Sequence, residues 1–219
     1  MASERKEILV FSTGQRFVHW LHTFAFILLM LTGAMLYVPW FSQTVATGAG
    51  GHVVRFVHRV GAIAFILVPI LYIISDPKGW WADMKLTFSW GKEDLGWLMA
   101  APRYYFLGDE GAMPPQEKFN TGQKLFYLVV VVCMVGFIVT GLIMWLGQGS
   151  VPVWVFQWSV VLHDLCTIAY AAFFLVHFML SVMHPLMKGA INGMLFGWMP
   201  EEYIKHHHAK YYDKIQGES

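Results

Sequence analysis

Four long apolar runs alternate with polar connections along the 219-residue chain. Each run is long enough to supply the roughly 20 residues that a helix needs to cross the hydrocarbon core of a bilayer. Prolines near the ends of three of the runs indicate where those helices stop, because proline disrupts a helix interior. The pattern predicts membrane-spanning helices at residues 17–38, 53–74, 125–146 and 153–183.

The composition supports lipid as the solvent. Hydrophobic residues make up 57% of the chain and charged residues only 13%, whereas a soluble domain carries about 25% charged residues. The net charge of +1 gives no reason to expect binding to nucleic acid. We find no internal repeat. We therefore expect an all-α protein, an integral membrane four-helix bundle that forms a single domain over residues 1–219.

The distribution of basic residues predicts the orientation. With four spans, the N-terminal segment, the connection 76–124 and the tail 186–219 all lie on one side of the membrane, and only Arg55 and Arg59 lie on the other. Loops rich in lysine and arginine stay in the cytoplasm, so both termini are predicted to be cytoplasmic. The connection should lie on the membrane surface as short amphipathic pieces. The basic residues of the three segments are Arg5, Lys6, Arg16, Lys78, Lys85, Lys92, Arg103, Lys118, Lys124, Lys188, Lys205, Lys210 and Lys214.

Four of the ten histidines carry the argument, and all four lie inside the predicted spans: His19, His58, His163 and His177. Ionisable side chains within a membrane are costly and usually functional. His163 and His177 are separated by 14 residues, which is close to four helical turns, so they project from the same face about 21 Å apart. One of them should therefore lie near each surface of the membrane.

The direction of each span predicts the partners of these two histidines. His58 should lie at the outer level with His163, and His19 at the inner level with His177. Two such pairs can each hold the iron of a b-type haem, because ligand sites in helix bundles are built from side chains on facing helices. No haem-attachment motif is present, so the haems would be non-covalent. His22, one turn from His19, remains an alternative inner ligand.

Arginines lie beside several of these histidines. Arg16 precedes His19 at helical spacing, while Arg55 and Arg59 flank His58. Arginine forms charge-assisted hydrogen bonds to carboxylates, so these side chains can anchor haem propionates, although arginines at helix ends also snorkel to the surface without a ligand. Among the other histidines, His184 would lie near the inner haem or at the membrane interface. We expect His52, His206, His207 and His208 to be solvated, although the run of three can also bind a metal ion.

Several motifs resemble those of bacterial di-haem cytochrome b subunits, within the cytochrome b561 and hydrogenase cytochrome b superfamily. They are Arg16-Phe-Val-His19-Trp20, Arg55-Phe-Val-His58, Leu162-His163 and Leu175-Val-His177. The segment Asn120-Thr121-Gly122-Gln123-Lys124 is similar to the Asn-x-Gly-Gln-Lys motif of respiratory formate dehydrogenase gamma subunits. The resemblance covers nearly the whole chain.

The resemblance implies a role in electron transfer. A gamma subunit of this type lies in the bacterial cytoplasmic membrane and takes electrons from an iron–sulfur subunit on the outer side. It passes them through an outer and an inner haem b to menaquinone. His58 and His163 would hold the outer haem and His19 and His177 the inner one. The chain has no motif for the primary substrate, so that chemistry would belong to a catalytic subunit of the same complex.

The resemblance also implies that Asn120, Gly122 and Gln123 line the quinone site. Asparagine and glutamine side chains supply the N–H donors that a quinone carbonyl needs, but asparagine is also a favoured N-cap of a helix. Two other functions remain open: the cytochrome b of a hydrogenase or another iron–sulfur oxidoreductase, and a metal transporter with intramembrane histidine ligands. Transporters usually have carboxylates along the transport pathway and an internally repeated architecture. In this chain, Asp164 is the only acidic residue well inside a span.

Overall fold

The computed structural model describes residues 6–109, 111 and 113–217, so that Arg5 lies outside the described residues. The chain divides into two compact units. The first unit is Ser12–Trp80, and the second contains the residues up to Phe11 and those from Trp81 onwards. The single domain over residues 1–219 remains a prediction.

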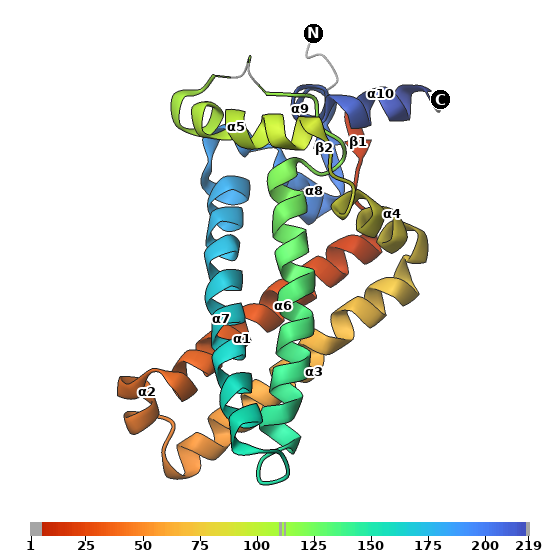
Figure 1. The fold of residues 1–219 in the computed structure, drawn as a ribbon. Helices are drawn as coiled ribbons and strands as arrows, with labels where there is room; N and C mark the ends of the chain where they lie inside the picture. The colour runs from red at the N-terminus through yellow and green to blue at the C-terminus, as the bar shows by residue number, and fades with distance from the viewer. Residues whose placement is uncertain (1–5, 110, 112, 218–219) are drawn as a thin grey trace. The chain divides into compact units, whose positions relative to one another are not determined.

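The first unit is a helical hairpin. Helix α1 (Thr13–Tyr37) packs along α3 (Gly48–Ser75), and the short α2 (Pro39–Thr44) lies between them in the chain (Figure 1). Ser12 starts α1 with a capping box, in which its hydroxyl accepts the N–H of Gln15 and the Gln15 side chain accepts the N–H of Ser12. Val18, Val68 and Tyr72 form a small core between the two helices.

The second unit contains another helical hairpin, α6 (Thr121–Leu146) and α7 (Val153–Phe178). Helix α7 continues into a π-helical turn, η2 (Met179–Met183). Helix α5 (Lys92–Leu107) lies across the end of this hairpin where α6 begins (Figure 1). The remaining elements are α4 (Pro77–Thr87), η3 (Pro185–Met187), α8 (Ala190–Phe196), α9 (Glu201–His207), α10 (Ala209–Gly217), β1 (Glu7–Leu9) and β2 (Trp198–Pro200).

Segments from both ends of the chain meet in the second unit. Strand β1 pairs antiparallel with β2, with Glu7 opposite Pro200. The core beneath them joins the N-terminal segment, the connection before α6 and the tail, through Val10, Phe11, Phe119, Met199 and Ile204. These contacts hold the three polar segments together within the second unit, and the charge pattern predicts that they share one side of a membrane. That this side is the cytoplasm remains a prediction.

The four predicted spans are helices in the structure. Among the described residues, four helices are long and apolar enough to cross a membrane: Thr13–Tyr37, Gly48–Ser75, Thr121–Leu146 and Val153–Met183. The first three begin four or five residues earlier than the apolar runs suggested. At α1 and α6 the reason is the cap, because a capping box extends the helix into polar sequence.

The two hairpins share a sequence pattern, so our expectation of no internal repeat is wrong. Thr13-Gly-Gln-Arg16 opens α1 and Thr121-Gly-Gln-Lys124 opens α6, 108 positions later. The dipeptide Thr32-Gly33 recurs at the same interval. His58 and Tyr72 on α3 correspond to His163 and His177 on α7, both at an interval of 105. The common pattern is short and polar, and the long apolar runs between these positions obscure it.

Candidate functional site

His58 and His163 occupy corresponding places in the two hairpins. His58 projects from α3 toward α1, where its Nδ1 lies 2.8 Å from the hydroxyl of Thr32. His163 projects from α7 toward α6, where its Nδ1 lies 2.8 Å from the hydroxyl of Thr140. Arg55 and Arg59, within one turn of His58, are both exposed. Each of these histidines is therefore held by a side chain of the facing helix.

The start of α1 carries the inner candidates. Arg16 has a buried Nε with no hydrogen-bond partner among the described residues. A buried guanidinium nitrogen without an acceptor suits an anion such as a haem propionate. The ring of His22 packs on Phe65 of α3, with centroids 4.7 Å apart, while the ring of His19 lies edge-on to Trp20. His22 is therefore used in packing within the hairpin.

His177 lies at a cavity of about 390 Å³ in the second unit. Asn120, Gly122 and Gln123, at the start of α6, line the same cavity. Its other walls are mostly apolar and include Trp97, Leu98, Pro102, Phe106, Phe126, Phe173, Leu180 and Met187. An apolar cavity of this size with a few convergent polar groups is typical of a small-molecule site. The structure thus brings together the four residues that the resemblance assigns to the quinone end.

The capping box of α6 determines which atoms face this cavity as donors. The side-chain oxygen of Asn120 accepts the N–H of Gln123, and the side-chain oxygen of Gln123 accepts the N–H of Asn120, both at 2.9 Å. Both oxygens are therefore occupied by the helix start. The two amide nitrogens have no acceptor within the part of the chain that the structure describes. The capping role and the donor role that we weighed as alternatives are compatible.

The corresponding end of the first hairpin is closed by hydrogen bonds. There the amide nitrogen of Gln15 donates to the Tyr72 hydroxyl at 2.9 Å, and Ser12 donates to Asp76 at 2.9 Å. The counterparts of these four residues in the second hairpin are Gln123, His177, Asn120 and Ser181, which all line the cavity. At matching positions of the repeat, the first hairpin therefore has side chains that hydrogen-bond to one another, whereas the second has side chains that line a cavity.

Helix α5 is held over the cavity by a buried ion pair. The ammonium of Lys124 lies 2.7 Å from the Asp94 carboxylate, and both side chains are almost fully buried. Thr121 also donates to Asp94, at 2.8 Å. Burial raises the pKa of Asp94, but the hydrogen bonds from Lys124 and Thr121 more than offset this and hold the pKa below its ordinary value.

The contact between α5 and α6 requires a glycine. A Cβ at Gly122 would lie 2.8 Å from the Trp97 ring.

Asp94→Asn is expected to destabilise the second unit by about 3 kcal/mol or more, because it leaves the Lys124 charge buried without a counter-charge. Thermal unfolding in detergent measures this effect. Glu202→Gln is the matched control, because the Glu202–Lys205 pair is exposed and exposed pairs contribute little. An Asp94→Asn protein as stable as the control would show that the ion pair does not hold α5.

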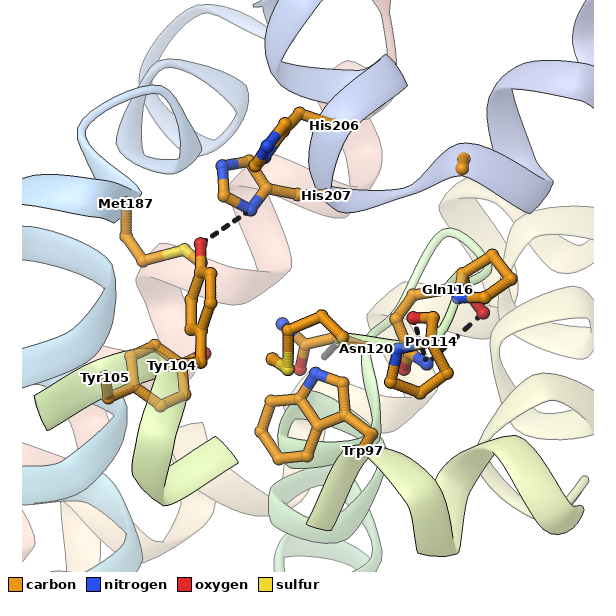
Figure 2. A pocket seen from close by; sticks show the side chains of 12 residues that line it. Trp97, Tyr104, Tyr105, Pro114, Gln116, Asn120, Met187, His206 and His207 are labelled. Atoms are coloured by element: carbon orange, nitrogen blue, oxygen red, sulfur yellow. Dashed lines mark hydrogen bonds between the residues drawn. The ribbon is translucent and has the colours of Figure 1, made fainter. Parts of the chain in front are cut away.

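A smaller and more polar cavity of about 170 Å³ adjoins the first one. Trp97, Tyr105, Asn120 and Met187 line both cavities. Figure 2 shows Trp97 and Asn120 near one another. It also shows the Tyr104 hydroxyl directed at His207, with the hydroxyl oxygen 3.1 Å from Nδ1 of the histidine. Burial lowers the pKa of His207 to about 4, with further contributions from His206 and His208, so this histidine is neutral at pH 7.

Two further histidines, His208 and His184, have structural roles that the sequence did not indicate. His208 is buried and donates from Nδ1 to the Glu117 carbonyl at 2.8 Å, so its predicted solvation is wrong. His206 is exposed, as expected. His184 donates from Nε2 to the Tyr105 carbonyl, and its Nδ1 accepts the N–H of Leu186. Within the described residues, no group of three histidine, cysteine or acidic side chains is arranged to hold a metal ion.

The predicted haem pairs each join one histidine of the first unit to one of the second. The pairs His58–His163 and His19–His177 therefore remain predictions. The residues present fit a haem: imidazole nitrogens can serve as iron ligands, and the buried Arg16 nitrogen suits an anionic propionate.

Comparison with known proteins identifies the family of this chain. The profile of the prokaryotic cytochrome b561 family matches residues 10–197. The cytochrome b556 subunit of formate dehydrogenase from Haemophilus influenzae is 27% identical over 96% of this chain and 84% of the relative. In Escherichia coli K12, the cytochrome b556 subunit of the nitrate-inducible formate dehydrogenase is 26% identical over 98% of this chain and 94% of the relative. The cytochrome b556(fdo) subunit of formate dehydrogenase from the same organism is 23% identical over 97% of this chain and 95% of the relative. The chain belongs to the prokaryotic cytochrome b561 family.

Proposed function

We propose that this protein is the membrane electron-transfer subunit of a formate dehydrogenase-like complex, carrying electrons from an iron–sulfur subunit through two b haems to menaquinone. Bound to the chain, the haems supply one-electron transfer. His58 and His163 hold one of them, and His19 and His177 the other. Arg16, Arg55 and Arg59 bind propionates. The relatives' names support the type of complex, and a catalytic subunit carries out the chemistry on the primary substrate.

The observation that carries the proposal is the cavity beside His177. Asn120 and Gln123 offer amide donors there, and the apolar walls accept a ring and an isoprenoid chain. Quinone reduction consumes protons. The polar cavity that shares Asn120 and contains His207 and Tyr104 provides room for water on the side of the polar segments.

The location of the quinone has an energetic consequence. We place the polar segments in the cytoplasm of a bacterial inner membrane, so the cavity lies near the inner surface, while His58 and His163 lie toward the outer surface. A donor docked outside would deliver electrons that cross inward and meet protons from the cytoplasm. Moving each charge stores about 2.3 kcal/mol per 100 mV of membrane potential.

The test is a visible spectrum of the purified protein, reduced with dithionite, combined with a haem count. We expect two low-spin haems per chain, all released by acidified solvent because no covalent attachment motif is present. Co-purified iron–sulfur and catalytic subunits, together with haem reduction by formate, would identify the complex. A colourless protein from a haem-replete host would rule out the proposal.

A further inference from the structure

We propose that Thr32 and Thr140 are positioning residues that hold His58 and His163 in the tautomer whose Nε2 binds iron. The inference rests on the proposed haem-binding function. It concerns two hydroxyl groups that lie in apolar helices and that no motif of the sequence singled out.

The hydrogen bonds of Thr32 determine the tautomer of His58. The Thr32 hydroxyl lies 2.8 Å from the Leu28 carbonyl, which can only accept. A hydroxyl has one hydrogen, so that hydrogen is used in this bond. The 2.8 Å contact with His58 Nδ1 must then be a bond in which Nδ1–H donates. Nε2 is left without a proton, and its lone pair is available to a metal.

The same logic applies independently in the second hairpin. The Thr140 hydroxyl lies 2.6 Å from the Gly136 carbonyl and donates its hydrogen there. His163 Nδ1, 2.8 Å away, must therefore donate to the Thr140 oxygen. The two threonines are counterparts in the repeat, 108 positions apart.

The glycine after each threonine belongs to the same arrangement. A Cβ at Gly33 would contact Cε1 of His58 at 3.6 Å, and one at Gly141 would contact Cε1 of His163 at 3.7 Å. Cε1 is bonded to Nε2. Glycine therefore leaves the edge of each ring next to the predicted iron-binding atom uncovered by the facing helix.

A hydrogen bond from a hydroxyl to the backbone of its own helix does not by itself explain the contacts of Thr32 and Thr140 with the histidine rings. Serine and threonine in helices commonly donate to the carbonyl four residues earlier, and Thr23, Ser159 and Thr167 do so here. Among the hydrogen bonds of the described residues, only those of Thr32 and Thr140 combine such a bond with one from an imidazole. A second hydrogen bond to the ligand is how proteins fix the tautomer and the orientation of a metal-binding histidine.

This bond also has an electronic effect. Donation from Nδ1–H makes the imidazole more basic toward the metal, which favours ferric over ferrous iron. Loss of the acceptor should therefore raise the midpoint potential of the haem concerned. A hydroxyl is a neutral acceptor, so the effect is smaller than that of a carboxylate.

The experiment measures haem potentials in the assembled, haem-loaded protein. Thr32→Val and Thr140→Val keep the side-chain shape but remove the acceptor. Each variant should retain both haems and shift the midpoint potential of one haem to a more positive value. The proposed pairing of His58 with His163 predicts that both variants affect the same haem. Low-spin electron paramagnetic resonance should show altered g values for that haem. Thr32→Ser and Thr140→Ser should restore the wild-type values.

Thr167→Val is the matched control, because the Thr167 hydroxyl donates to the backbone carbonyl of His163, at 2.9 Å, and not to its ring. It should leave both potentials unchanged. If a valine variant does not assemble, Thr140→Cys, with a weaker acceptor, should still give a positive shift. Unchanged or more negative potentials in the threonine variants would overturn the positioning role. If instead His58→Ala and His163→Ala retained both haems, the haem assignment itself would fail.

Discussion

His163→Ala is expected to lose one of two haems almost completely and His177→Ala the other, with the remaining haem still bound in each variant. Both histidines lie on the continuous helix α7, and their separation of about 21 Å is too large for one haem iron to bind both. Loss of one axial ligand leaves the iron with an incomplete set of protein ligands. A haem count per chain, combined with a potentiometric titration that resolves the two haems, measures the result.

His206→Ala is the control for this experiment, because His206 is exposed on α9 and should not affect either haem. The pair His19→Ala and His22→Ala tests the inner ligand on α1. We expect only His19→Ala to lose a haem, and the same one as His177→Ala, because His22 packs on Phe65. Equal loss of both haems from each single variant of a folded protein would contradict two separate sites.

Much of the fold could be predicted from the sequence because the bilayer imposes a simple requirement. The four apolar runs had to form helices, since unpaired backbone groups are too costly in lipid. The helix starts were less predictable. Ser12 and Asn120 extend α1 and α6 through capping boxes, which depend on short polar motifs that a hydropathy pattern ignores.

The polar end of the second unit could not be predicted in the same way. The pairing of β1 with β2 and the burial of His208 against Glu117 both depend on contacts between segments far apart in the chain. A run of three histidines near the C-terminus has the composition of a solvated tail. Only the assembled unit shows that exposure decreases along the run, from the exposed His206 to the buried His208.

The histidines of the candidate site stood out because they are polar residues in apolar helices, whereas their threonine partners did not. Threonine is ordinary in a membrane helix, since its hydroxyl can bond to its own backbone. The available signal was the repeat, in which Thr32-Gly33 and Thr140-Gly141 accompany His58 and His163 at nearly constant intervals.

Asn120→Asp and Gln123→Glu are expected to slow reoxidation of the haems by a menaquinone analogue by about tenfold to a hundredfold, because a hydrogen bond to a developing charge is worth roughly 1.5–3 kcal/mol. Both substitutions keep the oxygen atoms that cap α6 and replace the amide donors by carboxylate oxygens. The fold and both haems should therefore be retained. Rapid mixing of the reduced protein with the analogue measures the rate.

Gln15→Glu provides the matched control in the other hairpin. Gln15 occupies the same place in the capping box of α1, but its amide donates to the Tyr72 hydroxyl and does not line the cavity. A glutamate there can accept the Tyr72 proton instead, so reoxidation should proceed at the wild-type rate. If Asn120→Asp and Gln123→Glu were also reoxidised at that rate, the quinone would have to bind away from the start of α6. The inward movement of charge that this location implies would then lose its support.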